Sequence, residues 1–270
     1  MINNKEKRAI EAFQAIRSDI PDLEEQDQPN YLPEIMENND NLEETYQLAL
    51  DLWLSSFNPN ELKELINQYL KLVHCKEKTK NLQVIKKKLK KIRKAGLIFG
   101  TAKHFCHNES PLPSDFIKFL KIMGKLADHF EDEQGPEKAK KILEITENVS
   151  NIDLGYISTD IDEYKLRIEV FKNRAQTFLK EDKLTIPNFH KLRKELRHIM
   201  NLYQIAAARD LNNKDVLRTF QFLVKLNSKL GDIHDVFVAK KISGEIDYEN
   251  STMTIPDDIK QILKNFYQQL

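Results

Sequence analysis

The stretch that most directly indicates the fold is residues 189–197, which read Phe189-His190-Lys191-Leu192-Arg193-Lys194-Glu195-Leu196-Arg197. Its apolar residues Phe189, Leu192 and Leu196 are spaced by three and four, the period of one face of an α-helix. The same period continues outward through most of the 270-residue chain, which contains only seven glycines and nine prolines. We therefore expect an all-α fold.

The apolar period predicts ten helices. They span residues 4–17, 41–56, 59–76, 80–104, 113–131, 135–149, 159–181, 187–209, 213–241 and 256–269. Pro113, Pro187 and Pro256 stand at or near the first turn of three of them, where proline is favoured. Segments 18–40 and 243–255 are predicted loops, and no segment alternates at period two for long enough to suggest a sheet.

A shift of 107 residues brings two halves of the chain into register. It aligns residues 82–92 with residues 189–199, so that apolar residues match apolar residues. Lys86 then matches Arg193, and Lys90 matches Arg197. With no gap it also places Gly124 on Gly231 and Asp128 on Asp235. Chance supplies apolar matches between helices more readily than it supplies glycine on glycine at the same offset. We expect an internal duplication that builds two pseudo-symmetric four-helix bundles.

Charge divides the chain into an acidic front and a basic body. The formal net charge is zero, yet residues 1–60 contain four Lys/Arg and 13 Asp/Glu. The rest of the chain therefore has an excess of nine positive charges. The predicted organisation is an acidic N-terminal helix and linker at 1–44, a first helical bundle at 45–150 and a second helical bundle at 151–270.

Basic residues form a stripe beside the apolar face in both halves. His190, Arg193 and Arg197 fall within an arc of about 60° at 100° per residue. In the first half, the run 86–94 contains seven cations and no acid. Such a run repels itself unless an anion is supplied, and Arg and Lys are the residues that bind phosphate oxygens. The alternative is a solvated charged face.

These residues resemble the CHAD family (conserved histidine α-helical domain) over about residues 45–270. The family pattern is an apolar-His-x-x-Arg-x-x-x-Arg/Lys helix followed by a Leu-Gly-x-x-x-Asp helix, matched here by 189–197 and by 230–235. The first half is similar, with Gln83 in place of the histidine, and Met200 is a second departure from the pattern. The resemblance implies a basic channel between two bundles that binds inorganic polyphosphate. The polyphosphate-binding candidates are His190, Arg193, Lys194, Arg197, Lys86, Lys90, Arg93 and Lys94.

Four further residues are expected to have structural roles. Gly124 and Gly231 permit close helix approach, and Asp128 and Asp235, one helical turn later, pair with a cation on the neighbouring helix. The alternative role for the aspartates is a general base, but no nucleophile or second acid stands at matched spacing in both halves. We therefore expect no catalytic residues and no enzyme. Trp53 is predicted to lie in the core.

A zinc site is the remaining alternative for the histidines and cysteines. The two groups of metal-competent residues, His74-Cys75 and 104–107, end successive helices, whose ends lie about 30 Å or more apart if the helices are antiparallel. We expect no metal and no cofactor. The two cysteines fit a reducing cytoplasm, and neither a signal peptide nor a run of about 18 apolar residues is present. We expect a cytoplasmic protein without membrane association.

The function expected from the sequence is non-catalytic binding of inorganic polyphosphate or a similar polyanion. One alternative is a helical scaffold that binds other proteins and has lost polyphosphate binding. The other is nucleic-acid binding through the same basic helices. Single-strand binders interleave aromatic residues with cations, and the run 86–94 has no aromatic residue.

Overall fold

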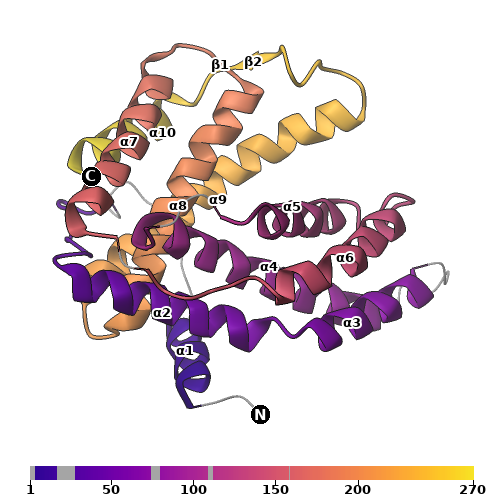
Figure 1. Cartoon of the computed structure of the whole chain (residues 1–270). Helices are drawn as coiled ribbons and strands as arrows, with labels where there is room; N and C mark the ends of the chain where they lie inside the picture. The colour runs from indigo at the N-terminus through magenta and orange to yellow at the C-terminus, as the bar shows by residue number, and fades with distance from the viewer. Residues whose placement is uncertain (1–3, 17–27, 74–79, 109–111, 158) are drawn as a thin grey trace. The chain divides into compact units, whose positions relative to one another are not determined.

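The computed structural model describes residues 4–16, 28–73, 80–108, 112–157 and 159–270. In that part of the chain it is predominantly helical, which confirms the all-α prediction (Figure 1). The helices are α1 (Asn4–Ala15), α2 (Asn39–Ser56), α3 (Pro59–Leu72), α4 (Lys80–Cys106), α5 (Ser114–Asp128), α6 (Gly135–Ser150), α7 (Ile161–Lys180), α8 (Ile186–Arg209), α9 (Lys214–Ile242) and α10 (Asp257–Gln269).

A short sheet corrects the expectation that the chain forms no strands. Strand β1 (Leu184–Thr185) pairs antiparallel with β2 (Thr252–Met253), with Leu184 opposite Met253. Each strand has two residues, too few for an alternating pattern to be visible in the sequence. The pair holds the loop before α10 against the start of α8, where the Thr185 hydroxyl accepts a hydrogen bond from the Asn188 amide as an N-cap.

The chain folds as two compact units. Unit 1 contains residues 1–11 and 43–158, and unit 2 contains residues 12–42 and 159–270. The sequence predicted a separate N-terminal helix and linker at 1–44, whereas the described residues 28–42 group with the C-terminal half of the chain.

The core of unit 1 is built around Trp53 of α2. Its ring stacks on Phe57 with centroids 4.5 Å apart and meets Phe116 of α5 edge-on at 5.2 Å. A Cβ at Gly96 of α4 would lie 3.1 Å from the Trp53 ring, so the glycine lets α4 pack against it. Trp53 is only 1% exposed, which confirms the prediction that it is a core residue.

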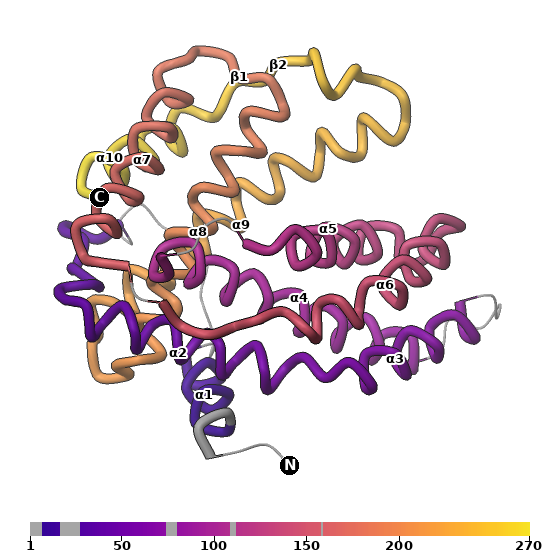
Figure 2. Tube along the Cα trace, viewed as in Figure 1, coloured from indigo at the N-terminus to yellow at the C-terminus, as the bar shows by residue number. Residues whose placement is uncertain are grey.

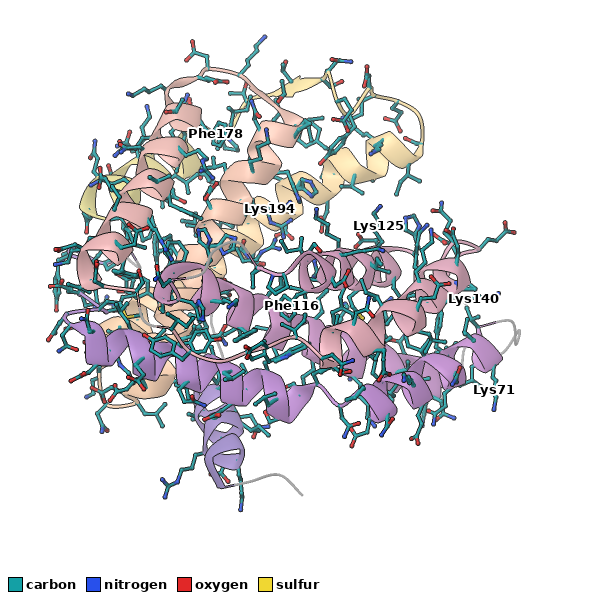
Figure 3. The ribbon with its side chains drawn as sticks, in the orientation of Figure 1. Lys71, Phe116, Lys125, Lys140, Phe178 and Lys194 are labelled. Carbon is teal, nitrogen blue, oxygen red and sulfur yellow. The ribbon has the colours of Figure 1, made fainter. Side chains whose placement is uncertain are left out.

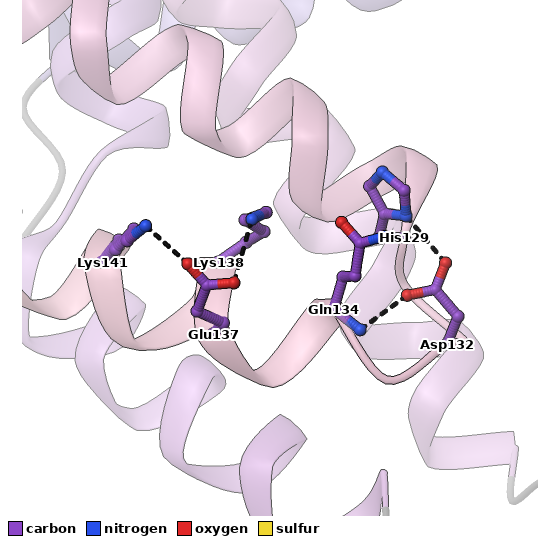
Figure 4. A network of polar contacts seen from close by, with 6 residues as sticks. All are labelled: His129, Asp132, Gln134, Glu137, Lys138 and Lys141. Carbon is purple, nitrogen blue, oxygen red and sulfur yellow. Dashed lines mark hydrogen bonds and ion pairs between the residues drawn. The ribbon is translucent and has the colours of Figure 1, made fainter.

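A polar network closes the turn between α5 and α6 (Figure 4). His129 Nδ1 lies 2.7 Å from Asp132 Oδ2, and further along α6 the Glu137 carboxylate accepts hydrogen bonds from Lys141 and Lys138. The hydrogen bond from Lys141, followed by that from Lys138, lowers the pKa of Glu137 to about 2. The positive charges of these two α6 lysines are thus offset by an acid within their own helix.

Unit 2 is organised around the antiparallel pair α8–α9, joined by residues 210–213 (Figure 2). Residues 199–208 of α8 are all buried, whereas residues 186–198 bury only part of the helix surface. Helix α7 packs on α8 and α10 packs on α7. The basic residues of α8 other than Arg209 lie in residues 186–198, the part of the helix that remains accessible.

Residues 31–42 are held on unit 2 by polar side chains of α8. Arg209 donates to the carbonyl of Ile35 at 2.8 Å and to that of Asn41 at 3.2 Å. The Tyr203 hydroxyl donates to the carbonyl of Pro33 at 3.0 Å. A cavity of about 360 Å³ lies between this segment, α7, α8 and the C-terminus. This part of the predicted loop 18–40 is therefore an anchored component of unit 2.

Arg209→Met should loosen this segment. The substitution keeps an apolar stem but removes the donors to two carbonyls, and hydrogen bonds to a charged group contribute about 1.5–3 kcal/mol each. We expect a loss of at least about 1.5 kcal/mol in the free energy of unfolding and faster amide hydrogen exchange in residues 31–42. The control is Arg218→Met, an exposed arginine of α9 with no ion pair to any described residue. Equal effects of the two substitutions would contradict the anchoring role.

Candidate functional site

The close contact between α8 and α9 is built on Gly231. Arg193 of α8 lies across this glycine, and a Cβ at position 231 would stand 2.7 Å from Arg193 Nη2. Burial lowers the pKa of the Arg193 guanidinium, while the negative charges of Asp235 and Asp232 act in the opposite direction. Arg193 is thus a partly buried cation at the helix interface, which lies against a glycine and is influenced by the negative charges of two aspartates.

One turn further along, two histidines meet. His190 precedes Arg193 by three residues, and His234 follows Gly231 by three residues. His190 Nδ1 lies 3.1 Å from His234 Nε2, and the ring centroids are 4.7 Å apart. Tyr248, from the segment between α9 and β2, places its hydroxyl 2.8 Å from His234 Nε2. We call His190, His234 and Tyr248 the imidazole cluster.

Cations surround the imidazole cluster. Burial, and then the positive charge of Lys194 and other neighbouring cations, lowers the pKa of His190 to about 4. Burial also lowers the pKa of His234, followed by the charge of Arg193. Both imidazoles are therefore neutral near pH 7. Burial disfavours charge of either sign on the rings, whereas the neighbouring cations disfavour added positive charge and favour an anion at the accessible edge.

The accessible edge of the cluster carries long basic side chains. Lys194 is exposed on α8 (Figure 3), and Arg197 is partly exposed one turn further on. Lys241 of α9 lies over the Tyr248 ring with its Nζ 4.5 Å from the centroid. The structure thus brings His190, Arg193, Lys194 and Arg197 together on one side of α8. We call these four residues, with the imidazole cluster and Lys241, the α8–α9 basic face.

Unit 1 contains a related arrangement on α4 and α5. Arg93 lies across Gly124, where a Cβ would stand 3.0 Å from Arg93 Nη2. Burial lowers the pKa of Arg93, and the negative charge of Asp128 opposes that effect. The glycine, the arginine across it and the aspartate four residues later therefore occur in both units.

Of the remaining polyphosphate-binding candidates of unit 1, one forms an ion pair and the others are exposed or partly exposed. Lys86 pairs with Glu131 at 3.2 Å and lies over the Phe130 ring, 5.3 Å from its centroid. Lys90 is exposed and forms no ion pair with any described residue, as is also true of Lys87, Lys88 and Lys91. Lys94 is partly exposed beside Arg93. The accessible positive charge of α4 therefore lies mainly on its exposed lysines.

The structure corrects the residue pairing expected for α4 and α8. The 107-residue shift matches Lys86 with Arg193, but the residue that lies across Gly124 is Arg93. By geometry Arg93 corresponds to Arg193, and Lys90, three residues earlier, stands where unit 2 has His190. The two alignments of α4 on α8 differ by seven residues. Seven residues are almost two helical turns and return to nearly the same face, so periodicity cannot distinguish them.

Three residues of the basic face were not among the sequence candidates. His234 carried a signal, because it lies three residues after Gly231 and hence on the helix face that meets α8. Lys241 and Tyr248 carried none, because only the path of the chain after α9 brings Tyr248 back to the cluster.

The described residues contain no candidate metal site and no candidate membrane-spanning helix. No three His, Cys, Asp or Glu side chains there are grouped so that they could hold a metal ion. His74 and Cys75 lie outside the described residues, and Cys106 is buried. Within the described residues, no helix combines the length and apolar character needed to cross a bilayer.

Comparisons with protein-family models, curated proteins and solved structures find no match to this chain. In the described residues, the fold and the site define a predominantly helical chain whose second unit presents a cationic face around two neutral histidines.

Proposed function

We propose that the chain is a non-catalytic, cytoplasmic polyanion-binding protein whose ligand is inorganic polyphosphate. The observation that carries the proposal is the imidazole cluster, where Lys194, Arg193 and Arg197 crowd positive charge around His190. A solvated charged face keeps its cations apart in water and needs no such concentration of charge. A chain of phosphates supplies repeated oxyanions for Arg, Lys and His donors.

We also propose that the two units are divergent copies of one four-helix bundle and that the chain is a divergent member of the CHAD family. The recurring glycine, arginine and aspartate support this, since Arg93 with Gly124 repeats the contact of Arg193 with Gly231. The copies differ in the histidine position, where unit 1 has Lys90. Lys90 provides a permanent point charge, whereas His190 is an imidazole that can be neutral or charged.

Nucleic-acid binding through the same face is the second candidate and is less favoured. Proteins that bind single strands stack bases on accessible aromatic rings. Of the large apolar side chains that are well exposed among the described residues, Tyr31 alone is aromatic. The Tyr248 ring is already covered by Lys241. The face therefore offers charge without an open stacking surface.

The proposal is tested by titrating the full chain with long-chain polyphosphate at about 50 and 200 mM salt. If the face neutralises about three or four phosphates, the affinity should fall on the order of 10- to 100-fold between these salt concentrations. Single-stranded RNA as competitor should displace the ligand poorly, and no free phosphate should accumulate.

Each alternative has its own outcome in this titration. Equal competition by RNA would favour the nucleic-acid candidate, and phosphate release would show an enzyme. The absence of binding at low salt would exclude the polyanion proposal and leave a helical scaffold for other proteins.

A further inference from the structure

The imidazole cluster contains more hydrogen-bonding groups than two neutral histidines can satisfy together. His234 Nδ1 lies 3.6 Å from the Asp235 carboxylate, an arrangement that favours a hydrogen on Nδ1. His234 Nε2 then has one lone pair, and the Tyr248 hydroxyl lies 2.8 Å and His190 Nδ1 3.1 Å from it. If His190 has its hydrogen on Nδ1, two donors compete for this lone pair, and if the hydrogen is on Nε2, the lone pairs of the two rings face each other. With either tautomer of His190, one hydrogen-bonding group of the cluster is left poorly satisfied.

A single added proton resolves this conflict. With hydrogens on both nitrogens, His234 directs Nδ1–H toward Asp235 and Nε2–H toward His190 and Tyr248. His190 then accepts at Nδ1 and carries its own hydrogen at Nε2. Since His234 is only 7% exposed and His190 is partly exposed, His190 is the ring from which a donor can reach a bound oxyanion.

Burial, and then the cations around the cluster, disfavour this protonation in the free protein. The cations are Arg193, Lys194 and Arg197 of α8, and the acids Asp232 and Asp235 of α9 act in the opposite direction. Lys241 lies over the Tyr248 ring, and Glu249 acts on the tyrosine from the same segment. An anion held by the α8 cations would offset their charge at the imidazoles and so remove the charge repulsion that adds to the cost of burial.

We propose that binding of an oxyanion to the α8–α9 basic face is coupled to the uptake of one proton by the His190–His234 pair. The inference rests on the proposed function and assigns a regulatory property to the same site. The proton comes from solvent and is shared by the two rings, and no bond of the anion is made or broken. By linkage, the affinity for the anion rises as pH falls.

The range of pH in which this occurs follows from the lowered pKa values. In the free protein the histidines titrate below the ordinary value near 6.5, and that of His190 is about 4. The bound anion raises both values. Proton uptake is therefore greatest between the lowered pKa values of the free protein and the higher values of the bound state, and it disappears at alkaline pH, where neither state is protonated.

Calorimetric titration with long-chain polyphosphate near pH 6 tests the proposal. This probe is suitable because only its two terminal groups titrate near neutral pH, as phosphomonoesters do. The binding heat is measured in two buffers that differ in ionisation enthalpy, and the difference gives the number of protons taken up. We expect between about half a proton and one proton for each occupied face, and little uptake near pH 8.

Two variants and one control assign the protons to the pair. His190→Gln and His234→Gln should each remove most of the uptake, because each breaks the shared hydrogen bond. His198→Gln is the matched control, since this α8 histidine packs edge-on against Phe171 of α7 and should leave uptake intact.

The outcomes separate this inference from the proposed function. Salt-dependent binding with equal heats in the two buffers would overturn proton coupling and leave polyanion binding standing. The absence of binding at low salt would overturn both. Undiminished uptake in both histidine variants would assign the proton to other groups and would overturn the role of the pair.

Discussion

Replacing Lys194 and Arg197 together by glutamine should weaken polyphosphate binding about tenfold to several hundredfold. A hydrogen bond to a charged group contributes about 1.5–3 kcal/mol, and about 1.4 kcal/mol corresponds to a factor of ten in affinity. The expected loss is less than twice the single contribution, because neighbouring contacts to one flexible ligand are not additive. Binding measured at several salt concentrations should also show a shallower salt dependence, since two fewer counterions are released.

Arg193 is unsuitable for this experiment despite its place in the same face. It lies across Gly231 at the α8–α9 contact, so its removal would alter helix packing together with charge. The matched control is Lys180→Gln with Lys183→Gln, which removes the same charge from the exposed end of α7 and the following turn. If the two double variants lose affinity equally, the net charge of the protein governs binding, and the α8–α9 basic face is not the site.

Trp53→Ala should destabilise unit 1 by about 3–5 kcal/mol, as expected when a large aromatic residue is removed from a core. Trp53 contacts Phe57, Phe116 and Phe119, so the substitution leaves a cavity bounded by three rings. Since the chain has two units, denaturant unfolding should be followed by circular dichroism and by hydrogen exchange in α4 and α5.

The neighbouring substitution Leu54→Ala provides the control for Trp53→Ala. Leu54 belongs to the same helix but is 45% exposed, so its removal should cost well under half as much. A small loss for Trp53→Ala, comparable with that of Leu54→Ala, would show that unit 1 does not depend on this aromatic core.

Local periodicity accounts for how closely the helices could be predicted. The predicted range 187–209 compares with Ile186–Arg209 for α8, and 213–241 compares with Lys214–Ile242 for α9. A helix is built from contacts three and four residues apart, and its ends depend on capping residues close by in the chain, such as Asn213 at the start of α9. All of these features are visible in a short window of sequence.

The register of one helix against its neighbour was not predicted correctly from the sequence. The 107-residue shift matched the glycines and aspartates, yet it placed Lys86 where the structure has Arg93. Helix α9 has 17 residues before its glycine and α5 has ten, because the two helices begin at Lys214 and Ser114. These lengths differ by seven residues, about two helical turns, so the same face of the helix points to the core in either register. Either register therefore buries the same kind of residue.

The sequence by itself determined the predominantly helical fold, the approximate helix boundaries, the buried position of Trp53 and the basic stripe of α8, because each of these depends on neighbours within a few turns. Only the tertiary structure decided which residues complete the site. His190 meets His234 across 44 positions and Tyr248 returns to the same point from beyond α9. In the same way, Arg209 holds Ile35 across 174 positions. Such contacts depend on the summed packing of whole helices, and no local pattern encodes where two distant segments meet.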